Sequence, residues 1–260
     1  MISIMVKDMK VLVTGASGRI GRAFIREYRN YYFFRFMLHK KPLEVFEGEV
    51  FYGDVSDFDS VLKAVEGVDA IVHLAADARV EADWNSILHT NIIGTYNVFE
   101  AARLHNVKKV VYASSNHACG TLVNERNIVG PDAPIAPDSL YGVSKVFGEA
   151  LAHYYFKKHG LSIICLRIGI CRDLEDPSQF FKEYLSGAKV HPTYSPEKIL
   201  GLWISASDMA QLIHKSLESD IKFGIFYGIS NNRNPAFDIS ETKAKLGYDP
   251  KDCAESHLKF

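Results

Sequence analysis

The sequence lacks the features that mark several classes of protein. Its four cysteines form no C-x-x-C pair and it has no H-E-x-x-H segment, so neither a metal site nor a dithiol redox site is expected. No stretch approaches the roughly 20 apolar residues that a membrane-spanning helix needs. A formal net charge of -1 gives no reason to expect nucleic acid or an anionic membrane as a partner.

What is present is typical of a soluble globular protein, with 47% hydrophobic and 23% charged residues. The apolar run at residues 4–6 is cut off by Lys7 and Asp8 and is too short for the core of a signal peptide. We therefore expect the first nine residues to be a leader before the first strand. Together with the scattered thiols, this predicts a cytoplasmic protein. The 260 residues fit one large α/β domain or one domain with a small lid.

Short apolar runs alternate with segments of helical periodicity along most of the chain. Strands are expected at 11–13, 33–38, 50–52, 70–74, 109–113, 162–166 and 225–229. Helices are expected at 20–28, 58–66, 84–104, 141–159, 207–217 and 240–246. This alternation predicts parallel β-α-β units, and hence an α/β fold with a Rossmann-like, doubly wound parallel sheet.

The expected elements divide the chain into two parts of one domain. Residues 10–170 are expected to form the dinucleotide-binding Rossmann core. Residues 171–260 are expected to form a small C-terminal substrate-binding lid that completes the same domain. Within this second part, residues 172–200 have weak periodicity and three prolines, which predicts an irregular excursion over the mouth of the active site.

A glycine-rich segment follows the first expected strand directly, with the pattern T-G-x-x-G-x-x-G at Thr14–Gly21. Gly15 permits the tight turn, Gly18 lets the backbone approach a pyrophosphate, and Gly21 lets the next helix pack close to the strand. Free N–H groups at the start of that helix would bind the phosphates. The alternative is a purely structural turn. The cofactor contacts expected in this segment are Gly15, Ser17, Gly18, Arg19, Ile20 and Gly21.

The end of the second strand normally distinguishes the two nicotinamide cofactors. An acidic residue there binds the ribose 2′-hydroxyl of NAD, whereas basic residues accommodate the 2′-phosphate of NADP. The sequence has His39, Lys40 and Lys41 at this point and no acid, which favours NADP over NAD. The alternative is that the lysines only belong to a solvated turn. Asp54, after the third strand, is expected to accept a hydrogen bond from the adenine amino group.

Tyr141 and Lys145 have the spacing of a proton-transfer pair. Hydride transfer from an alcohol carbon needs an acceptor for the hydroxyl proton, and a tyrosine with a pKa near ~10 is a poor base at neutral pH. A lysine one helical turn away places positive charge beside the phenolate and lowers that pKa. Tyr154 and Tyr194 also precede a lysine by four residues, so the context decides. Only Tyr141 opens a helix after a proline-rich loop, downstream of Ser114–His117 at the end of the fifth strand.

Together these motifs resemble those of the extended short-chain dehydrogenase/reductase superfamily, also described as the NAD-dependent epimerase/dehydratase family. The resemblance covers most of residues 10–250 and rests on Thr14–Gly21, His73–Ala76, Asn91–Thr95, Ser115 and Tyr141–Lys145. The uronate dehydrogenase branch is most similar at Ala113–His117, Leu140–Glu149 and Arg167–Gly169. Archaeal sugar dehydrogenases, among them an NAD-dependent glucose-6-phosphate dehydrogenase, are similar at the same segments and at Trp84 and Tyr227–Ser230. Such enzymes oxidise the anomeric carbon of a pyranose to a lactone.

The resemblance implies roles for the residues of the site. Ser115 would hydrogen-bond the reacting hydroxyl, Tyr141 would take its proton, and Lys145 would hold the nicotinamide ribose. Asn116 and His117 would contact the sugar. It implies further cofactor contacts at Val55, Leu74, Ala75, Ala76 and Asn91, and further substrate contacts at Asp77, Arg79 and Arg172. The alternatives are a strand-end cap for Ser115, a loop histidine held by backbone for His117 and, for Asn91, stabilisation of backbone beside the lysine helix.

Two departures from the family pattern concern the substrate. Ile170 stands where the branch has serine or asparagine after Arg-Ile-Gly. The next segment is longer than in the relatives and carries Arg172, Lys182 and Lys189, so the residue that replaces their carboxylate-binding arginine stays open. Arg79 is another candidate, since a planar guanidinium suits a carboxylate or a phosphate; the alternative for Arg79 is a plain surface charge.

The length of the chain bears on the substrate and the reaction. About 90 residues follow Arg167, too few for the large domain with which relatives hold nucleotide sugars. We therefore expect a dehydrogenase that oxidises a hexuronate, an aldose or a sugar phosphate. An epimerase or dehydratase that retains its cofactor is the second hypothesis, and a non-catalytic dinucleotide sensor is the third. The long helices expected at 84–104 and 141–159 predict a homodimer, because such helices often pair between subunits in this superfamily.

Overall fold

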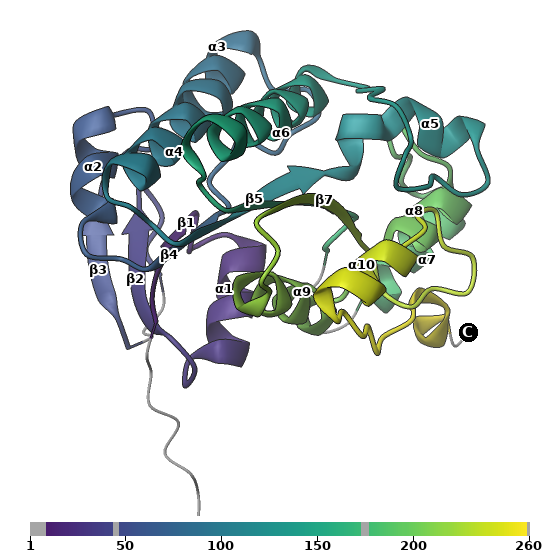
Figure 1. Cartoon of the computed structure of the whole chain (residues 1–260). Helices are drawn as coiled ribbons and strands as arrows, with labels where there is room; N and C mark the ends of the chain where they lie inside the picture. Colours follow the sequence, from purple (N-terminus) through teal and green to yellow (C-terminus); the bar gives the residue numbers. More distant parts are fainter. Residues whose placement is uncertain (1–8, 44–46, 173–176, 259–260) are drawn as a thin grey trace, which may run out of the picture.

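Seven parallel strands form the centre of the structure (Figure 1). The computed structural model describes residues 9–43, 47–172 and 177–258, so the expected leader lies, except for its last residue, outside the described residues. The strand order is β3-β2-β1-β4-β5-β6-β7, so the chain winds outward from β1 and returns to β4 on the other side of β1. The strands are β1 Lys10–Thr14, β2 Phe33–Leu38, β3 Glu49–Tyr52, β4 Ala70–His73, β5 Lys109–Ser115, β6 Ile163–Ile168 and β7 Phe223–Gly228.

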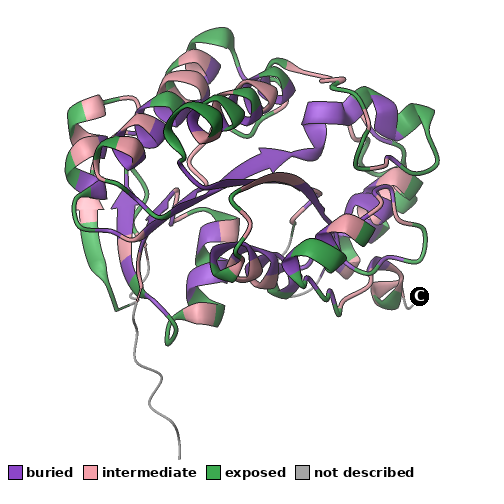
Figure 2. Ribbon diagram, in the orientation of Figure 1, coloured by how far each residue is buried: buried purple, intermediate pink, exposed green. Residues whose placement is uncertain are grey.

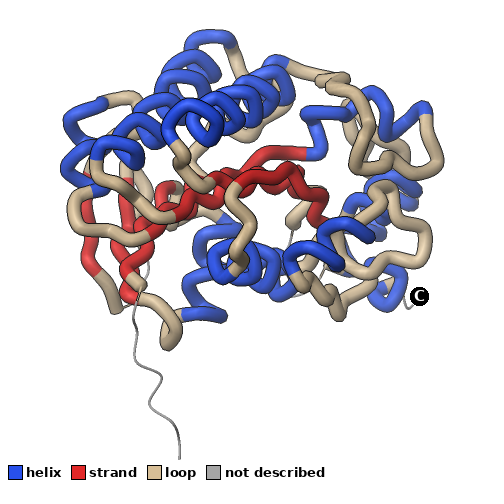
Figure 3. Tube along the Cα trace, viewed as in Figure 1, coloured by secondary structure: helices blue, strands red, loops and turns tan. Residues whose placement is uncertain are grey.

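Helices cover both faces of this sheet (Figures 1 and 3). One face is covered by α2 Phe58–Val65, α4 Gly94–Leu104 and α6 Leu140–His159, and the other by α1 Arg19–Tyr28 and α9 Ala206–Glu218. The shorter helices are α3 Trp84–Ser86, α5 Gly120–Glu125, α7 Ser178–Leu185, α8 Pro196–Leu202 and α10 Ser240–Leu246, with the 3-10 turns η2 Asn116–Cys119 and η3 Ala254–His257.

Side chains of each strand alternate between two hydrophobic cores, one on each side of the sheet. In β1, Val11 and Val13 pack with Phe24 of α1, whereas Leu12 packs on the opposite side with Val98 of α4. Figure 2 shows the result, a buried sheet between helices whose outer faces are exposed. The predicted Rossmann-like, doubly wound α/β fold is therefore confirmed.

The helix expected at 84–104 is one helical stretch with an internal change of hydrogen-bond register. Between α3 and α4 lies a π-helical segment, η1 Ile87–Ile93. Such π turns are rare and are often found at functional sites. Asn91, one of the predicted site residues, is buried within this segment. The sequence pattern did not reveal the π turn, because its apolar residues fit an ordinary helix equally well.

The prediction of an irregular segment at 172–200 is wrong in part. This region contains α7 and most of α8, whose buried residues include Phe181 and Ile199. These helices have 8 and 7 residues, shorter than the window in which apolar periodicity becomes recognisable. Residues 173–176, which belong to the expected excursion, lie outside the described residues.

Helix α6 carries Tyr141 and Lys145, and its packing against β5 depends on Gly148. A Cβ atom on Gly148 would lie 2.2 Å from the hydroxyl oxygen of Tyr112, which is buried in β5. At the start of the helix, the Ser139 hydroxyl accepts a hydrogen bond from the third backbone N–H that follows. The glycine therefore lets the helix approach the strand closely, which sets the depth of the two ionisable side chains.

Replacing Gly148 by alanine tests this close packing. We expect Gly148→Ala to lower the free energy of unfolding by about 1–3 kcal/mol, because an added methyl group overpacks a core that cannot yield. Gly130→Ala is the matched control, since nothing lies within 4 Å of a Cβ at that position. Urea denaturation followed by circular dichroism would measure the free energy of unfolding of both variants. Equal losses of stability in the two variants would contradict the close packing of α6 on β5 at Gly148.

Candidate active site

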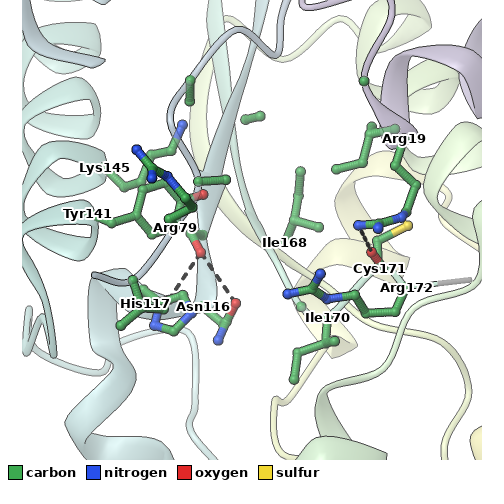
Figure 4. A pocket seen from close by; sticks show the side chains of 18 of the residues that line it. Arg19, Arg79, Asn116, His117, Tyr141, Lys145, Ile168, Ile170, Cys171 and Arg172 are labelled. Atoms are coloured by element: carbon green, nitrogen blue, oxygen red, sulfur yellow. Dashed lines mark hydrogen bonds between the residues drawn. The ribbon is translucent and has the colours of Figure 1, made fainter. Parts of the chain in front are cut away.

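A pocket of about 560 Å³ opens at the carboxyl ends of the central strands, where parallel sheets bind ligands. Tyr141 and Lys145 lie on one side of it and Arg19, Cys171 and Arg172 on the opposite side (Figure 4). The predicted site residues that line it are Gly15, Gly18, Arg19, Ile20, Gly21, Leu74, Ala76, Arg79, Ser115, Asn116, His117, Tyr141, Lys145 and Arg172. Its lining does not include Ser17, His39, Lys40, Asp54, Val55, Ala75, Asp77 and Asn91.

The glycine turn has a shape that fits a dinucleotide pyrophosphate. Gly15 has a φ of +69°, and a Cβ there would lie 2.7 Å from the backbone nitrogen of Ala75. A Cβ on Gly21 would lie 2.6 Å from the carbonyl oxygen of Ala16, so α1 packs tightly under the turn. Gly18 lies at the pocket and has no side chain to block it. Because α1 begins there without a side-chain cap or an acidic first turn, its N–H groups can bind phosphate oxygens.

The residues expected at the adenosine end pair with one another. Nε2 of His39 lies 3.4 Å from the carboxylate of Asp54, which also accepts a hydrogen bond from the backbone N–H of Ser56. Partial burial raises the pKa of Asp54. The hydrogen bonds from Ser56 and the neighbouring side chains of His39 and Lys40 outweigh burial, so the pKa of Asp54 is lowered. Asp54 is thus an ionised acceptor beside a histidine. Val55 is buried under Gly94 at the start of α4 and supports the loop from below.

Ser115, Tyr141 and Lys145 come together at the end of β5. All three side chains are buried. The Lys145 ammonium nitrogen lies 5.4 Å from the centre of the Tyr141 ring and 5.1 Å from that of Tyr112. The Ser115 hydroxyl accepts a hydrogen bond from the backbone N–H of His117 and donates one to the side-chain oxygen of Asn116, both at 3.3 Å. Ser115 also forms a hydrogen bond with Tyr141. A serine, a phenol and an amine therefore meet on one wall of the pocket.

Burial changes the proton affinity of both ionisable groups of this cluster. It raises the pKa of Tyr141 to about 12, with the Ser115 hydrogen bond opposing the rise. It lowers the pKa of Lys145 to about 7, with the charge of Glu149 opposing the fall. The sequence predicted that Lys145 would lower the pKa of Tyr141, and the structure corrects this. Desolvation disfavours phenolate and ammonium alike, and it is the largest cause of both shifts.

Asn91 and Asp77 shape the site from behind the pocket wall. The Asn91 amide accepts from the backbone N–H of Asp77 at 2.8 Å and donates to the Asp77 carbonyl and the Ser144 hydroxyl, both at 3.0 Å. Ser144 in turn donates to the carbonyl oxygen of Tyr141. Asn91 therefore links the loop after β4 to the first turn of α6, which matches the backbone-stabilising alternative and not a direct cofactor contact.

The three cations near the pocket differ in what they contact. Arg79 lines the pocket, but its guanidinium forms two hydrogen bonds with the carboxylate of Asp77, which also accepts from Ser86. Arg19 donates to the carbonyl oxygen of Cys171 at 3.2 Å. Arg172 points into the pocket opposite Tyr141 (Figure 4), and none of the carboxylates in the described ranges forms an ion pair with it. Arg172 is thus the cation best placed for a substrate anion.

Sequence reasoning missed a hydrogen-bonded cluster around His117. Nδ1 of His117 lies 2.9 Å from both carboxylate oxygens of Asp138. Tyr194 donates to Asp138 at 3.0 Å and accepts from the amide of Asn116 at 2.8 Å. Burial raises the pKa of Asp138, but the hydrogen bonds from His117, Ser139 and Tyr194 outweigh burial and lower this pKa. The loop-histidine alternative therefore fails, because a carboxylate and not backbone holds His117.

A second buried network, also missed, lies beneath the catalytic strand. Both carboxylate oxygens of Glu149 accept hydrogen bonds from the guanidinium of Arg167 in β6, at 2.8 and 2.9 Å. Ser114 donates to the same carboxylate, and Arg167 also donates to Tyr227 in β7. Both charged side chains are at most 5% exposed. The network ties α6, β5, β6 and β7 together one helical turn after Lys145.

Neutralising Glu149 tests the weight of this ion pair. Glu149→Gln leaves Arg167 buried without a counter-charge, so we expect a loss of about 3–5 kcal/mol in the free energy of unfolding. The control is Glu241→Gln, which removes an exposed i,i+4 pair with Lys245 and should cost less than about 1 kcal/mol. Chemical denaturation would measure both, and a loss in Glu149→Gln no larger than in the control would show that the pair is not structurally important.

The sheet order, the glycine turn and the Ser115–Tyr141–Lys145 cluster define a Rossmann-fold enzyme that handles a dinucleotide. The family model described as the NAD dependent epimerase/dehydratase family matches residues 11–172, which is more than half of the chain. The chain belongs to this family. The family predicted from the motifs is thereby confirmed.

Several relatives that the chain resembles are named dehydrogenases. The NAD-dependent glucose-6-phosphate dehydrogenase of Haloferax volcanii is 37% identical, over 94% of this chain and 94% of its own length. The L-arabinose 1-dehydrogenase (NAD(P)(+)) of the same organism is 33% identical, over 94% of this chain and 96% of its own. A crystal structure of a uronate dehydrogenase mutant from Agrobacterium tumefaciens, complexed with NAD, is 33% identical with a TM-score of 0.79, covering 96% of this chain and 88% of that one. The protein is an oxidoreductase of the extended short-chain type that uses a nicotinamide cofactor.

Two features are absent from the described residues. No helix within residues 9–43, 47–172 and 177–258 is long and apolar enough to cross a membrane. In the same ranges, no group of three or more His, Cys, Asp or Glu side chains has a geometry suited to a metal ion.

Proposed function

We propose that the protein oxidises the anomeric carbon of a monosaccharide, a hexuronate or an aldose or its phosphate, to a lactone, with NAD or NADP as the hydride acceptor. The observation that carries this proposal is the meeting of the buried side chains of Ser115, Tyr141 and Lys145 in one pocket beside the glycine turn. The relatives named above act, by their names, on a sugar phosphate, a neutral sugar and a uronate, which supports a monosaccharide as the substrate class.

The side chains divide the proton chemistry among them. When bound, the nicotinamide accepts the hydride from the sugar carbon. Ser115 holds the sugar hydroxyl against Tyr141, and the Tyr141 phenolate takes the hydroxyl proton. Protonated Lys145 stabilises that phenolate across a low-dielectric space, where an opposite charge acts strongly. Because burial favours neutral Tyr141 and neutral Lys145, the pair ionises together: a proton that leaves one is best placed on the other.

An epimerase or dehydratase that keeps its cofactor is the alternative reaction for the same cluster. The two are separated by incubating the protein with NAD or NADP and glucuronate, galacturonate, glucose or glucose 6-phosphate while following absorbance of the reduced cofactor. Net reduction supports the dehydrogenase. Conversion of the sugar without net reduction supports the alternative. The pocket of about 560 Å³ is suited to a single sugar next to a nicotinamide ring.

Our proposal includes NADP as the preferred cofactor. No acidic residue follows β2, and Lys40 is exposed there. Asp54, which might otherwise repel a 2′-phosphate, is paired with His39. Lys40 therefore remains to attract that phosphate. The relative from Haloferax volcanii that is named for both NAD and NADP shows that such dual use occurs in this family.

We also propose a cytoplasmic homodimer. All four cysteines are free thiols, as expected in a reducing compartment. Helices α4 and α6 carry five exposed large apolar side chains, and exposed apolar surface often marks an interface. They are Tyr96, Leu104, Leu140, Val143 and Tyr154.

Replacing Tyr141 by phenylalanine tests the proton acceptor. We expect Tyr141→Phe to lower kcat by about a hundredfold or more, because the hydroxyl proton loses its acceptor, while cofactor affinity stays unchanged. Tyr154→Phe is the matched control, since Tyr154 lies on the same helix, four residues before a lysine, with its side chain largely in solvent. Steady-state rates and cofactor titration by fluorescence would decide; full activity of Tyr141→Phe would remove it from the mechanism.

Adding an acid after β2 tests the cofactor preference. We expect His39→Asp to shift the ratio of kcat/KM for NADP over NAD by roughly tenfold or more toward NAD, since a new carboxylate repels the 2′-phosphate and accepts from the 2′-hydroxyl. Lys40→Ala should weaken the use of NADP and leave that of NAD unchanged. An unchanged ratio of kcat/KM in both variants would disprove the preference for NADP.

A further inference from the structure

His191 lies in the loop between α7 and α8, within none of the motifs, and its ring lines the pocket. The ring stacks on Tyr194, with centroids 5.0 Å apart and planes 19° apart. Tyr194 stacks in turn on His117, at 5.5 Å and 29°. His117 meets the Tyr141 ring edge to face at 5.7 Å. A row of rings therefore leads from the proton acceptor to His191, which fixes the orientation of the histidine.

The hydrogen bonds of His191 determine which ring nitrogen carries the proton. Nδ1 accepts from the backbone N–H groups of Thr193 at 3.1 Å and Tyr194 at 3.2 Å. A nitrogen that accepts two hydrogen bonds carries no proton, so in the neutral ring the proton is on Nε2. Nε2 lies across the ring from the loop backbone, and among the described residues no acceptor is paired with it.

His191 also stays neutral at the pH of ordinary assays. Burial, with smaller contributions from the neighbouring side chains of His117 and Arg172, lowers the pKa of His191 to about 4, and Asp138 opposes the fall only in part. The side chain is therefore a permanent N–H donor held rigidly at the pocket.

We propose that His191 is a specificity residue that donates its Nε2–H to an anionic oxygen of the substrate, at the end of the sugar remote from the reacting carbon. This proposal rests on the proposed function and narrows its substrate class to sugars with a carboxylate or a phosphate. A pyranose whose anomeric carbon faces Tyr141 extends away from Tyr141 along the ring of His117. The ring centroids of His117 and His191 lie 6.4 Å apart, so the far end of the sugar points toward His191. A neutral donor that lines the same pocket as the Arg172 guanidinium binds an anion without adding a second full charge to the pocket.

The experiment uses a variant that removes the Nε2 donor and keeps an acceptor for the N–H groups of the loop. In His191→Asn the side-chain oxygen can replace Nδ1 as acceptor for the loop N–H groups, but nothing replaces Nε2–H. With saturating cofactor, we expect kcat/KM for glucuronate or glucose 6-phosphate, whichever the protein oxidises, to fall by roughly ten- to a hundredfold. The loss should lie in KM, with kcat within about twofold, because the contact is remote from the reacting carbon. Activity on glucose should change little.

Other outcomes would overturn the role of His191, and they can be told apart from a failure of the proposed sugar oxidation. An equal loss for glucose and for the acidic sugars would assign His191 to the shape of the loop, and no loss would remove it from binding. Oxidation of glucose alone by the wild-type protein would reject an anionic substrate. If no sugar were oxidised, the proposed function would fail, and nitrogen-15 NMR would still test the site. A shift of the His191 Nε2 resonance on adding glucuronate or glucose 6-phosphate supports the contact, and an unmoved resonance contradicts it.

Discussion

Burial of a phenol next to an amine is the constraint on which the whole site depends. Tyr141 and Lys145 lie on the first two turns of α6, and both side chains are buried at the pocket wall. In such surroundings each group resists ionising alone, so a charge on one is stabilised only by an opposite charge on the other. The pair therefore responds to proton transfer as a unit. This explains how a tyrosine with a raised pKa can still serve as a base while a substrate hydroxyl is held against it.

The rest of the scaffold keeps this pair at a fixed depth. Gly148 brings α6 against β5, Asn91 fastens its first turn to the loop after β4, and the Glu149–Arg167 ion pair ties its third turn to the neighbouring strands. Each of these contacts lies behind the pocket wall. They hold the reacting groups through rigid elements and not through mobile loops, as a preorganised site requires.

Much of the fold and part of the site could be predicted because their signals are local. The turn at Thr14–Gly21 and the Tyr141–Lys145 spacing are each carried by neighbouring residues. The pairing of His117 with Asp138 and the position of His191 were missed, because residues far apart in sequence meet only after folding. The direction of the Tyr141 pKa was wrong because spacing shows which charges are near but not how much water is removed.

The proposed function depends on hydride leaving the anomeric carbon of a sugar in this pocket. Glucuronate or glucose 6-phosphate deuterated at C1 tests this step when the cofactor is recovered and its mass is measured by mass spectrometry. We expect reduced cofactor to accumulate in step with the lactone and to carry the deuterium. Turnover that leaves the deuterium in the sugar, with no reduced cofactor released, would contradict it.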